Sequence, residues 1–193
     1  MGFDIYGINV PLTRAIPELP ETENEDEVIR KEYWNDLDNF YKENPGYYYR
    51  SNVWWWRPIV SFLDDNASDI LSEEDIKRLN ENSGHRIEGA VFKALQERFA
   101  LALEMNYVTA WIDVYKNALA NLPPERCHCC DGRGVLDSPP LFHDPEDDWN
   151  GDCHVCNGSG QVESFKKNYP TDLETFEEFN QFLQNCGEGF EVW

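Results

Sequence analysis

Basic residues and long hydrophobic runs are scarce in this chain of 193 residues. Lysine and arginine number 16 against 37 aspartates and glutamates, which gives a formal net charge of −21. Because this charge repels phosphate backbones and anionic lipid headgroups, we expect no direct nucleic-acid partner and no membrane partner. No run reaches the about 18 apolar residues that a membrane span needs. The first ten residues lack a signal-peptide pattern, so we expect a cytoplasmic protein.

Familiar catalytic signatures are also missing from the sequence. It has no phosphate-binding P-loop, no G-x-S-x-G nucleophile turn, no G-x-G-x-x-G motif opening a helix and no H-E-x-x-H metal motif. Only His85 and His143 lie outside the cysteine motifs described below, and the residues around His85 predict a turn. These absences favour a non-enzymatic protein.

Turn residues and hydrophobic spacing divide the chain into three predicted parts. Residues 1–125 form a helical domain with an N-terminal strand, and residues 126–165 form a zinc-knuckle module. Residues 166–193 form a C-terminal helix and strand that pack back on the helical domain. The predicted fold is mainly helical α+β, with about five helices, a small terminal β-sheet and a zinc-stabilised pair of hairpins.

Two segments of this fold carry specific expectations. Residues 86–122 contain no proline and predict one long helical segment. Its apolar face changes sides along its length, so either the helix bends near Asn106 or its two halves bury opposite faces. Residues 189–193 predict a short strand that pairs with residues 1–6.

Helix starts are marked by capping residues and proline. Pro58 predicts the first turn of a helix that reaches about Ala67. A side-chain oxygen at the N-cap and an acidic residue three positions later satisfy two free backbone N–H groups. Such capping boxes predict helix starts at Thr22, Ser72 and Thr171.

A duplicated cysteine motif carries the strongest chemical signal. The pattern C-x-x-C-x-G-x-G occurs at residues 127–134 and again at residues 153–160. Each C-x-x-C turn aims two thiolates at one point, and the glycines accept a positive φ that lets backbone amides face sulfur. In a chain without an export signal, such clusters indicate a metal before disulfides. We predict one structural zinc ion, with iron–sulfur ligation as the main alternative, bound by Cys127, Cys130, Cys153 and Cys156.

The remaining cysteines and nearby histidines are predicted to stay outside this metal site. Cys129 lies between two ligands and should point away as a free thiol. His128 and His154 each follow a ligand directly, and adjacent side chains rarely converge on one ion. Cys186 predicts a small buried hydrophobic residue. Since four sulfurs fill a tetrahedral shell, the site should be structural and not hydrolytic.

Two resemblances extend these predictions. The paired repeats resemble half of the cysteine-rich zinc region of the DnaJ co-chaperones over about 34 residues, but the chain has no HPD triad. That likeness implies only a zinc-bound hairpin module. The opening MGFDIYG, the segment YYYRSNVWWWRP at 47–58 and the paired knuckles are together similar to a family of small phage and prophage proteins without assigned activity. This similarity implies a soluble accessory protein inside a host bacterium.

An aromatic segment at residues 47–57 is the second candidate site. On a strand, Trp54 and Trp56 would share a face while Trp55 pointed away. The rings could anchor the core, form a partner surface or line a small-molecule pocket. Exposed tryptophans and a cavity near His85 would support the pocket. The candidate binding residues are Tyr49, Arg50, Trp54, Trp55, Trp56 and Arg57.

These observations support three functional hypotheses. The first is a zinc-binding, strongly acidic accessory protein, of phage origin, that binds a host or phage protein through the aromatic segment or its acidic face. The second is a nucleic-acid mimic whose carboxylates inhibit a DNA- or RNA-binding host defence enzyme. The third is a ligand-binding protein or enzyme with a pocket of tryptophan and arginine. The oligomeric state is left open.

Overall fold

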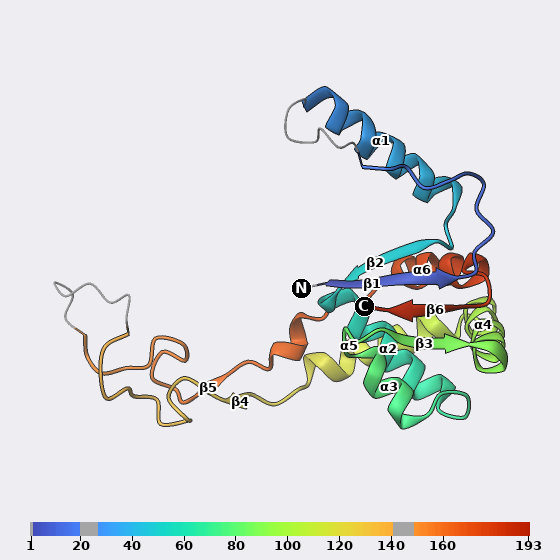
Figure 1. Cartoon of the computed structure of the whole chain (residues 1–193). Coiled ribbons are helices and arrows are strands. Elements are labelled where there is room, and N and C mark those ends of the chain that lie inside the picture. The colour runs from blue at the N-terminus through green and yellow to red at the C-terminus, as the bar shows by residue number, and fades with distance from the viewer. Residues whose placement is uncertain (1, 20–26, 141–148) are drawn as a thin grey trace. The chain divides into compact units, whose positions relative to one another are not determined.

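The computed structural model describes residues 2–19, 27–140 and 149–193, which divide into two compact units. The first unit comprises Met1–Asp113 and Pro170–Trp193, and the second comprises Val114–Tyr169. Six α-helices and two small antiparallel sheets occur among the described residues, which confirms the predicted α+β class (Figure 1). None of the described helices has the length and hydrophobicity to cross a bilayer.

A four-stranded antiparallel sheet is the frame of the first unit, with strand order β2-β1-β6-β3. Its strands are β1 (Gly2–Ile8), β2 (Tyr48–Asn52), β3 (His85–Glu88) and β6 (Gly189–Val192). Ile5 pairs with Val192 on one side and with Tyr49 on the other. The predicted pairing of the two terminal segments is therefore confirmed, and β2 and β3 extend the sheet on either side of that pair.

Aromatic side chains fill the space between one sheet face and three helices. These helices are α2 (Val53–Ala67), α4 (Gly89–Glu104) and α6 (Leu173–Asn185). Each contacts the sheet through a ring pair: Phe3 with Trp56, Phe190 with Phe92, and Tyr49 with Phe179. Fully buried rings in this core are Trp56, Phe62, Phe92, Phe99, Phe176, Phe179, Phe182 and Phe190. Because strand side chains alternate, the next residue of each strand faces away from these helices.

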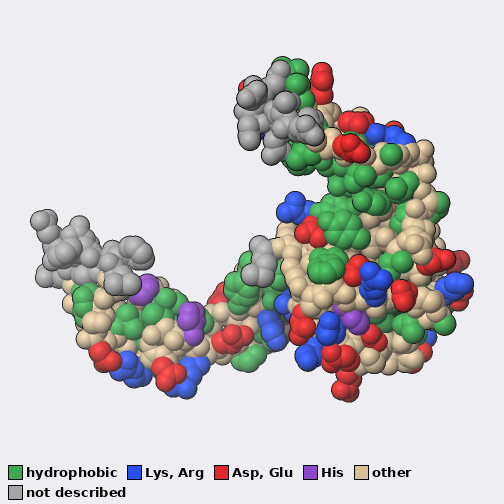
Figure 2. Space-filling model, viewed as in Figure 1, with side chains coloured by type: hydrophobic (Ala, Val, Ile, Leu, Met, Phe, Trp, Pro, Cys, Tyr) green, Lys and Arg blue, Asp and Glu red, His purple; other side chains and the backbone are tan. Residues whose placement is uncertain are grey.

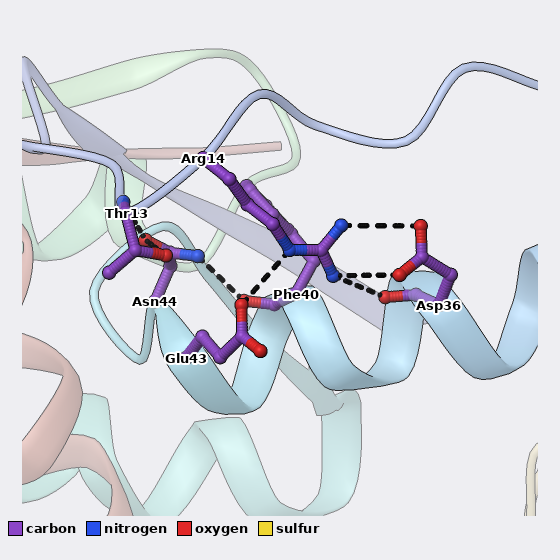
Figure 3. Close-up of polar contacts among 6 residues, drawn as sticks. All are labelled: Thr13, Arg14, Asp36, Phe40, Glu43 and Asn44. Atoms are coloured by element: carbon purple, nitrogen blue, oxygen red, sulfur yellow. Dashed lines mark hydrogen bonds and ion pairs between the residues drawn. The ribbon is translucent and has the colours of Figure 1, made fainter.

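Helix α1 (Glu27–Glu43) is tied to the segment that follows β1. Figure 3 shows the guanidinium of Arg14 over the ring of Phe40, bound to the carboxylates of Asp36 and Glu43. The predicted capping box at Thr22 lies outside the described residues.

Local chemistry explains three other helix starts. Ser72 and Asp75 form the predicted capping box at the start of α3 (Glu73–Leu79). The N-cap of α6 is Asp172, whose carboxylate accepts a hydrogen bond from the N–H of Thr175, so the prediction at Thr171 was wrong by one residue. Helix α2 begins five residues before Pro58, because the side-chain oxygen of Asn52 accepts from two N–H groups of the tryptophan run.

The predicted long helix over residues 86–122 is wrong at its start and interrupted in its middle. Strand β3 occupies its first residues, and Gly89, with a φ of 64°, begins α4. Asn106 has a φ of 57°, a left-handed conformation that breaks the helical hydrogen-bond pattern before α5 (Tyr107–Ala120). This break agrees with the expected bend near Asn106.

The second unit contains little regular structure. Strands β4 (Glu125–Arg126) and β5 (Gln161–Val162) form a two-stranded antiparallel sheet, and Val135 bridges to Asp152. A short 3-10 helix spans Phe165–Asn168. The division between the units falls within α5.

Candidate metal centre

Four cysteine sulfurs meet in the interior of the second unit. Cys127, Cys130, Cys153 and Cys156 are buried, and their sulfur atoms all lie within 4.8 Å of one another. The Sγ atoms of Cys127 and Cys153 are 3.8 Å apart, and those of Cys130 and Cys156 are 3.7 Å apart. Sulfurs bound tetrahedrally at about 2.3 Å from one ion lie about 3.8 Å apart, whereas a disulfide needs about 2.05 Å. The four thiols are therefore spaced to hold one metal ion.

Each C-x-x-C segment forms a tight turn, which ends in two residues with a left-handed backbone conformation. Asp131 and Gly132 follow the first pair with φ values of 53° and 76°, and the equivalent residues of the second pair have 48° and 82°. The chain then reverses, so that the N–H of Gly134 donates to Cys130 Sγ at 3.2 Å. The N–H of Gly160 donates to Cys156 Sγ at 3.3 Å. The predicted alignment of glycine amides with sulfur is confirmed.

The two knuckles also interlock through reciprocal backbone hydrogen bonds. The N–H of Cys127 donates to the carbonyl of Gly160 at 2.9 Å, and the N–H of Cys153 donates to the carbonyl of Gly134 at 2.8 Å. This close approach leaves no space for a side chain: a Cβ at Gly134 would lie 2.3 Å from the carbonyl oxygen of Gly158. The glycines of the motif are thus required for packing between the repeats as well as for their turns.

The thiols differ in how readily they ionise. Burial disfavours a thiolate at Cys153, but the backbone N–H groups of Cys156 and Val155 point at its sulfur and lower its pKa below that of an ordinary thiol. Equivalent N–H groups favour a thiolate at Cys127, yet burial and the thiols of Cys130 and Cys153 raise its pKa above that of an ordinary thiol. A bound cation favours the thiolate form of each ligand, so metal binding releases the protons that the metal-free site retains.

Neighbouring candidates lie outside the cluster. Cys129 is exposed, as predicted, and so are His128 and His154. Cys186 is buried in the first unit, where burial raises the pKa of its thiol to about 12. Its sulfur lies 3.5 Å from the carbonyl oxygen of Leu183. The prediction of a small buried residue at Cys186 is confirmed.

The tryptophan run begins a helix and does not form a strand. Trp56 is fully buried, its indole N–H donates to the carbonyl of Leu79 at 2.7 Å, and its ring contacts Phe3 and Phe179. Trp54 and Trp55 are half-buried in the first turn. Trp56 is therefore a core residue, and it does not offer the surface that a binding role would need.

Of the other aromatic-segment candidates, Tyr49, Arg50 and Trp55 line one pocket, whereas Arg57 is bound to Asn80. Tyr49 packs its ring on Phe179, and Arg57 donates to the side-chain oxygen of Asn80 at 2.7 Å. Arg50 is exposed and lies beside Trp55 in a pocket of about 200 Å³. This pocket is smaller than the about 300 Å³ at which ligand sites begin.

A histidine–carboxylate pair was missed from sequence. His85 Nε2 lies 2.9 Å from Asp75 Oδ1, and Ser72 Oγ donates to the other oxygen of that carboxylate at 2.7 Å. Burial raises the pKa of Asp75, but hydrogen bonds from Ser72 and His85 lower it below its usual value. A catalytic triad places the histidine next to the serine, whereas here the aspartate lies between them. The pair joins α3 to β3, and only the Ser72–Asp75 spacing was visible in the sequence.

Comparison with known proteins adds nothing to this picture. No protein-family model, curated protein or solved structure matches the chain. Its function must therefore be inferred from its own residues.

Proposed function

We propose that Cys127, Cys130, Cys153 and Cys156 bind one Zn²⁺ ion that stabilises the second unit. The observation that carries this proposal is the tetrahedral spacing of four buried sulfurs, two of which accept backbone N–H groups. Zinc bound by four thiolates has a closed shell, which is typical of structural sites. In a two- or four-iron cluster the four cysteines are divided among different irons, and the sulfurs on different irons lie farther apart than 4.8 Å.

The protein then acts by binding a host or phage protein. A closed metal shell leaves no position for water or substrate, and the Asp75–His85 pair serves to join two structural elements. A net charge of −21 disfavours nucleic acid as the direct partner. We further propose a role inside a bacterium, because the opening MGFDIYG, the segment at 47–58 and the paired knuckles resemble motifs of phage accessory proteins.

Metal analysis tests the zinc site. We expect one zinc per purified chain by elemental analysis, and visible absorption bands of sulfur-ligated tetrahedral cobalt after exchange with Co²⁺. Cys127→Ser should abolish stoichiometric binding. Cys129→Ser is the matched control, because it removes an exposed thiol from the same turn, and it should retain one zinc. Iron in place of zinc, or full zinc in Cys127→Ser, would contradict the proposal.

Affinity purification tests the binding role. The zinc-loaded chain is immobilised, exposed to bacterial lysate, and its bound proteins are identified by mass spectrometry. We expect a specific protein that a blank resin and an unrelated acidic protein do not retain. Recovery of nothing above these controls counts against the role in protein binding.

A further inference from the structure

Four tyrosines form a continuous aromatic surface in the first unit, distant in sequence from the cysteine motif. We call Tyr6, Tyr41, Tyr47 and Tyr48 the tyrosine surface. Tyr48 lies 5.1 Å from Tyr6 and 5.0 Å from Tyr41 between ring centroids. Tyr47 lies 6.4 Å and 6.3 Å from the same two rings. The four contacts close a loop, so the rings act as one cluster.

The fold explains why these rings remain accessible. Phe3 and Ile5 enter the core from β1, so Asp4 and Tyr6 emerge on the opposite face of the sheet. The antiparallel register places Tyr48 of β2 directly beside Tyr6. Tyr6 remains 38% exposed, and the other three tyrosines are partly exposed. Figure 2 shows hydrophobic side chains gathered beside α1 and over the adjoining strands.

The charged groups around the tyrosine surface give it a negative character. Asp4 accepts a hydrogen bond from the hydroxyl of Tyr48, and burial together with Asp4 raises the pKa of Tyr6. Burial, the neighbouring tyrosines and Asp38 raise the pKa of Tyr41. The faces of neutral aromatic rings also carry negative potential. Arg50 is a cation beside this group, 73% exposed and 3.9 Å from Asp4.

We propose that the tyrosine surface binds a positively charged side chain, arginine or lysine, of a partner protein. This inference rests on the proposed function, that the chain acts by binding a protein. A cation over several tyrosine rings gains a cation–π attraction, and the adjacent carboxylates add to it. Arginine, tyrosine and tryptophan also dominate the energetics of protein interfaces. Charge complementarity thus selects a basic segment over an anionic partner such as nucleic acid.

A basic peptide probes the surface directly. The zinc-loaded full chain is titrated with acetylated, amidated triarginine while its tyrosine ring resonances are followed by NMR. We expect the resonances of Tyr6 and Tyr41 to shift. Tyr41→Leu keeps an apolar side chain but removes the aromatic ring, and should weaken binding about two- to fivefold. Tyr41→Phe keeps the ring face and should bind like the natural chain.

Two further variants distinguish peptide binding at the tyrosine surface from general attraction to the negative charge of the protein. Tyr107→Leu removes a 52% exposed tyrosine from α5 and should leave peptide affinity unchanged. Arg50→Gln removes a positive charge that repels the basic peptide. It should therefore strengthen peptide binding. Equal losses in Tyr41→Leu and Tyr107→Leu, or no loss in Tyr41→Leu, would overturn the proposal. Circular dichroism and melting temperature verify that each variant is folded.

This design also distinguishes the two proposals from each other. A protein captured from lysate equally well by Tyr41→Leu and by the natural chain would refute the tyrosine surface and leave the binding role intact. Peptide binding at the tyrosine surface, with no protein captured, would refute the binding role and leave the surface intact.

Discussion

The two units of this protein are stabilised by different means. The first has a large aromatic core, in which Trp56, Phe99 and Phe179 are almost completely buried. In the second, the buried cluster among the described residues consists of the four cysteines, with Leu136 and Val162 packed against it. Burying one large apolar side chain contributes about 1.5–3 kcal/mol, so the first unit can fold on hydrophobic burial. The second has too little apolar surface, and we expect the metal to supply its stability.

Metal removal gives the largest expected effect. Structural zinc in small zinc-finger peptides contributes about 10–16 kcal/mol of apparent binding free energy, so chelation should unfold residues 126–162. Amide NMR signals of this region should collapse to unfolded positions, while those of Ile5 and Phe190 in the sheet stay in place. Added zinc should restore the spectrum. Loss of the sheet signals together with those of the knuckles would show that the two units fold as one.

Trp56→Ala is the reciprocal experiment. Truncating a buried tryptophan costs about 3–5 kcal/mol, and the variant also leaves the carbonyl of Leu79 without its indole donor. Urea unfolding followed by circular dichroism should show this loss in the first unit, and elemental analysis should still find one zinc. Trp34→Ala is the control, because Trp34 is 52% exposed on α1. This substitution should lower the unfolding free energy by less than about 1 kcal/mol. A drop in zinc content in Trp56→Ala would contradict the independence of the metal centre.

The metal site could be read from sequence because its chemistry is local. Each knuckle needs only eight consecutive residues, and the duplicated glycines reveal where the backbone must turn toward sulfur. The interlocking of the repeats through Gly134 and Gly160 was not visible, since it depends on how two distant turns meet. The spacing of the cysteines thus predicts the ligands and does not predict the contact between the knuckles.

The structure of the sheet and of the tryptophan run was harder to predict from sequence, because contacts between distant residues determine it. Strands β2 and β3 are short and rich in polar or aromatic residues, and they are defined by pairing with β1 and β6. Asn52 was the overlooked signal before the tryptophans, as it is a favourable N-cap residue and starts α2 there. Sequence patterns predicted the fold class and the terminal strands, while the edges of the sheet required the folded chain.

Gly134→Ala tests how tightly the second unit is constrained, with a smaller expected effect. A Cβ there would lie 2.3 Å from the carbonyl oxygen of Gly158, at a φ of +77°. Steric overlap and left-handed strain together should cost about 2–3 kcal/mol, or roughly thirtyfold or more in zinc affinity measured by chelator competition. Gly151→Ala is matched in backbone strain, with a φ of +90°, but its Cβ meets nothing within 4 Å. It should therefore weaken zinc binding much less, and equal losses would show that strain alone accounts for the effect.

The smallest expected effect returns to the first unit, where one polar contact supplements the aromatic core. Asp75→Asn should lower the unfolding free energy by about 1 kcal/mol at pH 7, because it weakens the capping box and the contact with His85.

The folded pKa of Asp75 is lowered, so its stabilising contribution is complete above the unfolded carboxyl pKa of about 3.9 and is lost as pH falls through the folded value. Urea unfolding between pH 7 and pH 3 should show the gap between the natural chain and Asp75→Asn narrowing below about pH 4. Asp64→Asn, at an exposed position on α2, should show no such gap. A gap that stays constant to pH 3 would mean that the asparagine is destabilising because it has one acceptor oxygen fewer, and that ionisation of Asp75 adds nothing to the first unit.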